Sequence, residues 1–303
     1  MKFLPFSRIT IFSLVALFAA ILFSCKKENS SSSTSQVVTD EQASVYTDES
    51  TQTDASFEDV GDVSMTAADE EGIASTGGRS ADASRGYFPT FDELRLRLGS
   101  CATITITPND STYPKRIVID FGDGCICADG KFRKGAIILD LTGPIRRSGS
   151  VLTITFRNFY LNRAHIEGTK IISNLSENGQ VKFTVQVVGG KVTFPNGRGY
   201  SYESLKYVVQ IEGMGTNTVR DDVYRIEGRS NTVFNSGVTV TLDTDDPLIK
   251  KVACPWISDG TLKIKINDRV FRLDYGFPHN GDCDNQALLL WNNGNSQRVI
   301  TLP

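Results

Sequence analysis

Apolar and polar residues alternate along much of the chain after residue 87. The stretch ATITIT, residues 102–107, places Ala102, Ile104 and Ile106 on one side and threonines on the other. The stretch TLKIKIN, residues 261–267, repeats this pattern with lysines at two of the polar positions. A period of two residues is typical of a β-strand that buries one face. Both stretches are therefore predicted to be half-buried strands.

Further runs rich in β-branched and aromatic residues lie between these stretches, mostly separated by Gly, Asn, Asp or Pro. Turn pairs such as Asn178-Gly179 tolerate the positive φ of tight hairpins, and short joints connect antiparallel strands. No long helical pattern is found after residue 100. The predicted fold class is mainly β, with residues 87–303 forming a single antiparallel β-sandwich-like domain. The pattern leaves a partly open barrel as an alternative.

The first residues indicate export. Lys2 and Arg8 precede an apolar run over residues 9–23. This run is too short for a comfortable membrane span. The run ends in Leu22-Phe23-Ser24-Cys25, which looks like a bacterial lipobox. Residues 1–24 are therefore predicted to be a lipoprotein signal peptide, and Cys25 is predicted to carry the lipid that anchors the protein to a membrane.

Residues 25–86 are predicted to be an acidic, flexible tether. Between residues 25 and 82 this segment contains thirteen acids and three cations, Lys26, Lys27 and Arg79, and few large apolar residues. A loosely helical spacing of apolar residues predicts one amphipathic helix at about 40–70, with Thr39 or Asp40 as its N-cap. Cleavage before Cys25 removes two positive charges from the formal net charge of −3 and leaves −5, so nucleic acid is not an expected partner.

The stretch FGDGCICADG, residues 121–130, combines thiols, carboxylates and turn-forming glycines. Thiols of exported proteins tend to pair, and about 7 Å between Cys125 and Cys127 on an extended strand exceeds the usual separation in a disulfide. The predicted bridges join Cys101 to Cys125 and Cys254 to Cys283, with Cys127 as the spare thiol. If Cys101 pairs with Cys127 instead, Cys125 is the spare thiol. The stretch is thus predicted to be a turn held by a disulfide.

Other candidate chemistry is weaker. The two histidines, His165 and His279, have no companions at metal-ligand or catalytic-triad spacing, so no catalytic residue is assigned. Two segments, 117–143 and 271–294, share the order strand, Asp, aromatic, Gly and a Cys-containing loop. If these units lie side by side, their carboxylates form a calcium-binding rim, the one cofactor site that the sequence suggests. The rim residues would be Asp120, Asp123, Asp282 and Asp284. The alternative places the loops at separate ends, with acids capping strand ends or facing water.

The lipobox-like stretch, IDFGDGC, ITFRNFYLNRAHIEGTKIISN and the closing DYG and GDCDNQA together resemble uncharacterised Bacteroidetes-type outer-membrane lipoproteins. The resemblance implies an outer-membrane lipoprotein with a β-rich domain that faces the periplasm or the cell surface, and it implies no catalytic residue. The expected function is that of a lipid-anchored binding or structural module with a glycan or protein partner. The alternative is a carboxylate-based glycan hydrolase or glycan-modifying enzyme, which would need two inward carboxylates on a concave face.

Overall fold

The computed structural model describes residues 39–76, 87, 89–216 and 220–302. The predicted signal peptide, Cys25 and the start of the predicted tether lie outside these residues. The described residues form helices α1 (Asp40–Ser75) and α2 (Asp92–Leu98) and a short 3₁₀ helix, η1 (Asn292–Gly294). Their strands are β1 (Thr103–Thr107), β2 (Lys115–Asp120), β3 (Cys125–Ile126), β4 (Phe132–Leu141), β5 (Val151–Leu161), β6 (Ala164–Asn174), β7 (Lys182–Thr193), β8 (Gly199–Glu212), β9 (Val223–Phe234), β10 (Thr239–Lys251), β11 (Ile257–Ile266), β12 (Arg269–Asp274), β13 (Gln286–Trp291) and β14 (Ser296–Thr301).

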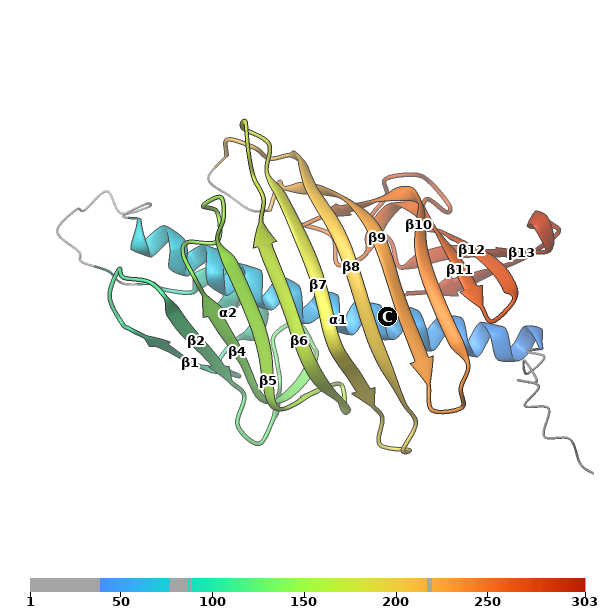
Figure 1. The fold of residues 1–303 in the computed structure, drawn as a ribbon, viewed down its shortest axis with the longest axis horizontal. Helices are drawn as coiled ribbons and strands as arrows, with labels where there is room; N and C mark the ends of the chain where they lie inside the picture. Colours follow the sequence, from blue (N-terminus) through green and yellow to red (C-terminus); the bar gives the residue numbers. More distant parts are fainter. Residues whose placement is uncertain (1–38, 77–86, 88, 217–219, 303) are drawn as a thin grey trace, which may run out of the picture. The chain divides into compact units, whose positions relative to one another are not determined.

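All of these strands belong to one antiparallel sheet in which each strand pairs with the next along the chain, except that β3 pairs only with β4 (Figure 1). The prediction of a mainly β, antiparallel domain is confirmed. The turn at Asn178-Gly179 has φ values of 52° and 78°, as the hairpin prediction requires. In β11 the predicted alternation is also present, since Leu262 is buried and Lys263 is exposed.

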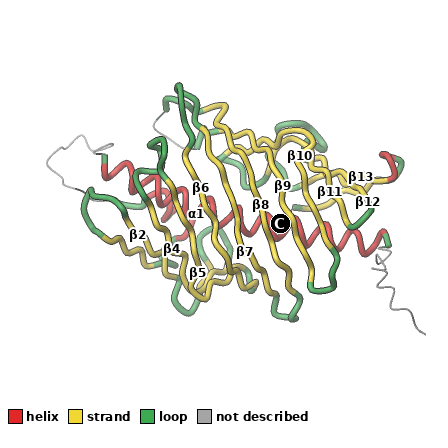
Figure 2. Tube along the Cα trace, in the orientation of Figure 1, coloured by secondary structure: helices red, strands yellow, loops and turns green. Residues whose placement is uncertain are grey.

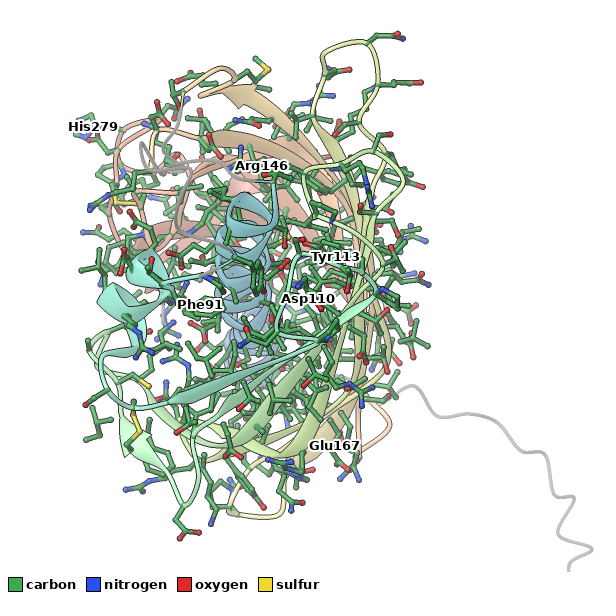
Figure 3. The ribbon with its side chains drawn as sticks, turned by 90° about the vertical axis from the view of Figure 1, so that its left-hand side faces the viewer. Phe91, Asp110, Tyr113, Arg146, Glu167 and His279 are labelled. Carbon is green, nitrogen blue, oxygen red and sulfur yellow. A yellow bond between two sulfur atoms is a disulfide. The ribbon has the colours of Figure 1, made fainter. Side chains whose placement is uncertain are left out.

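Helix α1 supplies the second layer that a sandwich would obtain from a second sheet. Figure 2 shows α1 running across the strands, and the view along the helix in Figure 3 shows the sheet curving around it. Phe57, Val60 and Val63 of α1 are fully buried, and the Phe57 ring stacks on Tyr202 of β8 with 4.8 Å between centroids. The hydrophobic core therefore lies between α1 and the inward face of the sheet.

The prediction of a solvated tether needs correction for residues 40–75. The helix expected at about 40–70 is present, begins at the predicted cap Thr39 and is integrated into the domain. Thr39 Oγ1 accepts a hydrogen bond from Gln42 N, and the Gln42 side chain accepts one from Thr39 N. Much of the buried helix surface consists of small or hydroxyl residues such as Ala43, Ser50 and Thr53, which do not produce an obvious apolar stripe in the sequence.

Close approach of α1 to β6 depends on a glycine. Lys170 of β6 is buried, and its Nζ donates a hydrogen bond to the Phe57 carbonyl oxygen of α1 at 2.7 Å. A Cβ on Gly61 would lie 2.5 Å from this Nζ and 2.9 Å from the adjacent Cε. Gly61 thus leaves the space in which the buried ammonium reaches the helix backbone.

Within the described residues, no helix combines the length and apolar character that a membrane crossing requires. Helix α1 has the length, but carboxylates recur along it, including Asp54, Asp59 and Asp69. Its burial therefore depends on partners for these charges, which Lys206 of β8, Arg133 of β4 and Arg146 of the β4–β5 connection provide.

We expect Gly61→Ala to lower the free energy of unfolding by about 1–3 kcal/mol, because the new methyl group must displace Lys170 from its buried bond. The matched control is Gly72→Ala in the same helix, where the nearest atom to a new Cβ lies 3.5 Å away on Pro144. This control should be stabilising by about 0.5–1 kcal/mol through helix propensity. Urea unfolding measures both, and equal stabilisation by the two substitutions would contradict the packing of α1 on β6.

Candidate functional site

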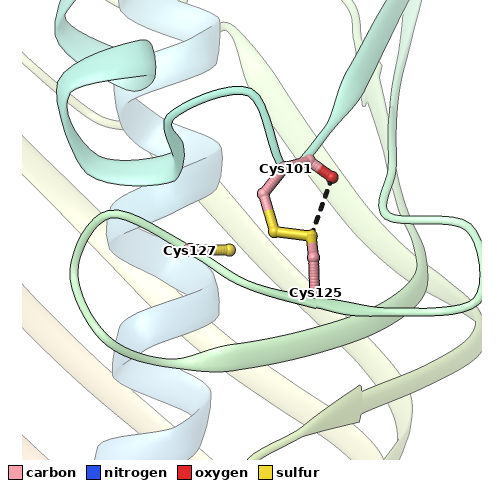
Figure 4. A group of neighbouring side chains, drawn as sticks. All are labelled: Cys101, Cys125 and Cys127. Atoms are coloured by element: carbon pink, nitrogen blue, oxygen red, sulfur yellow. Dashed lines mark hydrogen bonds between the residues drawn. A yellow bond between two sulfur atoms is a disulfide. The ribbon is translucent and has the colours of Figure 1, made fainter.

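Three cysteines gather beside α2 and β3. Cys101 follows α2, Cys125 begins β3, and the two form a disulfide with 5.8 Å between their Cα atoms (Figure 4). Cys127 is a free, buried thiol. The second predicted bridge, between Cys254 and Cys283, is also present, with a Cα separation of 5.7 Å. Both predicted disulfides and the spare thiol are confirmed.

The loop before β3 has the turn geometry that its glycines predict. Gly122 and Gly124 have φ values of 56° and 107°. A Cβ on Gly124 would lie 2.4 Å from the Phe132 ring, so the loop packs against β4 at that point. Cys127 N donates to the Lys131 carbonyl oxygen at 2.9 Å and continues the pairing of β3 with β4. The stretch FGDGCICADG is therefore a disulfide-held turn, as predicted.

The sulfur atoms of Cys101, Cys125 and Cys127 all lie within 4.8 Å of one another. Among the described residues, no other group of three or more His, Cys, Asp or Glu side chains converges in this way. While the disulfide is intact, Cys127 carries the one free thiol of the group. These three residues are referred to below as the three-cysteine cluster. Their sulfurs lie close enough for reactions between the free thiol and the disulfide. The sequence indicated only that Cys101 could pair with Cys125 or with Cys127.

A network of ion pairs adjoins the three-cysteine cluster at Arg133. Asp59 of α1 contacts Arg133 Nη2 of β4 at 2.9 Å, Lys131 Nζ at 2.8 Å and Arg97 Nη2 of α2 at 2.5 Å. Asp129 contacts Arg133 Nη2 at 2.7 Å and thereby pairs with the same guanidinium. Burial alone would raise the pKa of Asp59, but the three cations together outweigh it and hold that pKa at about 2. The network ties α1, α2 and the β3–β4 hairpin together.

Arg133 connects this network to the free thiol. Its side chain is fully buried, and its guanidinium lies beside the Cys127 thiol. Burial would lower the pKa of Arg133, yet its contacts with Asp129 and Asp59 raise that pKa above its ordinary value. Burial raises the pKa of the Cys127 thiol, and the Arg133 charge opposes this shift. The Nε of Arg133 is buried and has no hydrogen-bond acceptor.

Other acids of α1 also pair with cations inside the domain. Glu71 and Lys115 of β2 form an ion pair at 3.2 Å with neither side chain exposed, and Tyr87 and Tyr113 donate hydrogen bonds to the Glu71 carboxylate. Asp54 contacts Lys206 of β8 at 2.8 Å. Sequence reasoning missed these pairs. The available indication was the excess of acids in residues 40–75, which requires nearby cations once the helix is buried.

The predicted calcium rim does not form. Asp120 Oδ2 pairs with Arg157 at 2.6 Å, Asp284 Oδ1 accepts from Gln286 N, and the Asp282 carboxylate lies 3.7 Å from His279. The four predicted carboxylates do not converge, because β2 lies near one end of the strand order and β12 and β13 near the other.

The structure instead agrees with the alternative of separate loops. Asp120 Oδ1 accepts from Gly122 N, and Asp274 Oδ1 accepts from Gly276 N in the same way. The similarity between the two sequence segments therefore reflects one local turn that is used twice, with the aspartate closing the turn after each strand.

The histidines and surface depressions add no catalytic arrangement among the described residues. His165 stacks on Tyr160 of β5, whereas His279 is exposed in the connection between β12 and β13. A shallow depression of about 390 Å³ is lined by Ile126 and Phe132 of the β3–β4 hairpin and by Asn162 and Arg163 of the β5–β6 turn. It holds a single charged side chain and no carboxylate pair. Among the described residues, the three-cysteine cluster is therefore the strongest candidate for a reactive site.

We expect Asp59→Asn to lower the free energy of unfolding at pH 7 by about 3–5 kcal/mol, because it removes the buried carboxylate that pairs with Arg133, Lys131 and Arg97. The native pKa of about 2 lies below the ordinary value of 3.8, so the carboxylate stabilises the fold fully above about pH 4. This contribution is lost as the pH falls through 2. Urea unfolding of the wild-type protein and of Asp59→Asn should therefore give free energies of unfolding whose difference narrows between pH 4 and pH 2.

The control for this experiment is Asp140→Asn, which removes an exposed ion pair with Arg116 at 2.7 Å. Its effect should stay below about 1 kcal/mol, since solvent screens such pairs. A loss of the same small size in both variants, or a pH-independent difference for Asp59→Asn, would show that Asp59 is not held in a buried ion pair.

Comparison of the chain with protein-family models, curated proteins and solved structures finds no match. The features relevant to function are the lipobox-like stretch at Cys25, the two disulfides and the paired carboxylates between α1 and the sheet.

Proposed function

We propose that the protein is an exported, lipid-anchored module of the outer membrane with a binding or structural role. The observation that carries the proposal is the positively charged start, the short apolar run and the lipobox-like stretch that ends at Cys25. Acylation of this cysteine would hold the domain at a bilayer without a membrane-spanning helix, because several acyl chains together give stable anchoring.

The disulfides support the exported location. Cys101–Cys125 and Cys254–Cys283 together use four of the five cysteines that follow Cys25. Structural disulfides persist in oxidising compartments such as the periplasm or the cell surface and are rare in the cytosol of mesophiles. The two bridges close loops at opposite ends of the strand order, where they stabilise the connections beside β1 and β12.

The charge pairing favours a binding or structural role over the glycan-hydrolase alternative. Glycoside hydrolysis requires one carboxylic acid and one carboxylate placed on either side of a sugar. The inward acids Asp59 and Glu71 are instead engaged with Arg133 and Lys115, and α1 covers the sheet face on which a sugar would lie. No specific observation of the described residues favours the enzyme alternative.

We expect the full chain, expressed in a bacterium that processes lipoproteins, to fractionate with membranes and to require detergent for release. Mass spectrometry should find a mature N-terminus at acylated Cys25, and Cys25→Ala should abolish acylation and membrane retention. The control Cys127→Ala changes another cysteine and should remain anchored. A membrane-bound wild-type protein that retains Met1 would disprove lipid anchoring at Cys25.

A further inference from the structure

We propose that Cys101, Cys125 and Cys127 form an intramolecular thiol–disulfide exchange site. In the exchange, the Cys127 thiolate attacks Sγ of Cys101, the Cys101–Cys125 bond breaks and a Cys101–Cys127 bond forms. The electron pair of the broken bond leaves with Cys125 as its thiolate, which then takes up the proton that Cys127 lost. One thiol and one disulfide are present before and after the step, so it needs no external oxidant or reductant.

The short distances between the three sulfurs favour the exchange. Cys127 Sγ lies within 4.8 Å of both sulfurs of the disulfide, and Figure 4 shows its side chain directed toward them. A buried thiol held this close to a disulfide encounters it without the entropy loss of bringing two molecules together. The sulfur positions therefore favour attack within the domain over attack by an outside thiol.

Backbone geometry favours Cys101 over Cys125 as the sulfur that is attacked. Attack on Cys125 would join residues two apart along one extended segment, at a Cα separation of about 6.5–7 Å, whereas disulfides usually have about 5.5–6 Å. Cys101 belongs to a different segment, between α2 and β1, and its Sγ lies within 4.8 Å of Cys127 Sγ. Attack on Cys101 thus avoids a bridge between residues two apart, and it releases Cys125.

The Arg133 charge lies where it can stabilise a Cys127 thiolate. Exchange requires a thiolate, and burial raises the pKa of the Cys127 thiol. The charged groups around this thiol are Arg133 of β4, Asp129 of the turn between β3 and β4, and Asp59 of α1. Both acids already pair with Arg133, but its buried Nε still has no acceptor. A Cys127 thiolate would therefore lie beside the Arg133 guanidinium, whose charge opposes the rise in the Cys127 pKa.

The exchange moves the free thiol from a buried cysteine to one that is more accessible to solvent. Cys127 is 4% exposed, whereas Cys125 is only half-buried. After exchange, the Cys125 thiolate can attack an external disulfide, forming a mixed disulfide and releasing one external thiol. The site would thus react with small disulfides and electrophiles at Cys125, although the resting protein has its free thiol at Cys127.

The test is alkylation of the folded wild-type chain with iodoacetamide, followed by peptide mapping without reduction. We expect the label on Cys125 together with a Cys101–Cys127 bridge. The labelling rate should rise about tenfold per pH unit below the pKa of the attacking thiol. Label on Cys127 with an unchanged Cys101–Cys125 bridge, or no label on Cys125 while unfolded protein is fully labelled, would overturn the proposal.

Two variants sharpen the test. Cys127→Ser should leave Cys125 unlabelled, because no internal thiol can release it. Cys125→Ser should form the Cys101–Cys127 bridge on oxidation, and free thiols at both positions in a folded Cys125→Ser protein would overturn the proposal. The Cys254–Cys283 bridge and the circular dichroism spectrum report folding in each case. If Cys125→Ser fails to fold, the wild-type alkylation pattern decides alone.

Discussion

The pairing of acidic side chains on α1 with basic side chains on the inward face of the sheet is the constraint on which the rest of the structure depends. A charge removed from water is costly unless an opposite charge meets it in good geometry. Asp59 meets Arg133, and Glu71 meets Lys115, with these side chains almost completely buried. A shift of the helix by one turn would leave these charges unpaired, so the pairs set its position along the strands.

This constraint also explains the unusual composition of the helix. Its inward residues include Ala43, Thr47 and Ser64, which are small enough for the backbone to approach the sheet closely. Close approach in turn allows the buried Lys170 to reach the helix carbonyl at Phe57 beside Gly61. The helix is thus stabilised by close packing and ion pairs together, and an apolar stripe alone would not describe it.

The same ion pairs organise the surroundings of the three-cysteine cluster. Asp59 and Asp129 both pair with the Arg133 guanidinium, and this guanidinium lies beside the Cys127 thiol. The disulfide between Cys101 and Cys125 joins the segment after α2 to the same hairpin. Helix position, cation position and thiol environment are therefore linked through contacts between neighbouring side chains.

The sequence by itself determined the strands, the hairpin turns, a helix start at Thr39 or Asp40 and the Cys254–Cys283 bridge, because each depends on patterns within short segments or on the small number of cysteines. It favoured Cys125 over Cys127 as the partner of Cys101, and the structure confirmed this choice. Only the tertiary structure decided that residues 40–75 belong to the core and that the predicted calcium rim does not converge. The physical reason is distance along the chain: Asp59 and Arg133 are 74 residues apart, and no local pattern records their pairing. Strand periodicity shows which face is buried, and the fold alone shows what covers it.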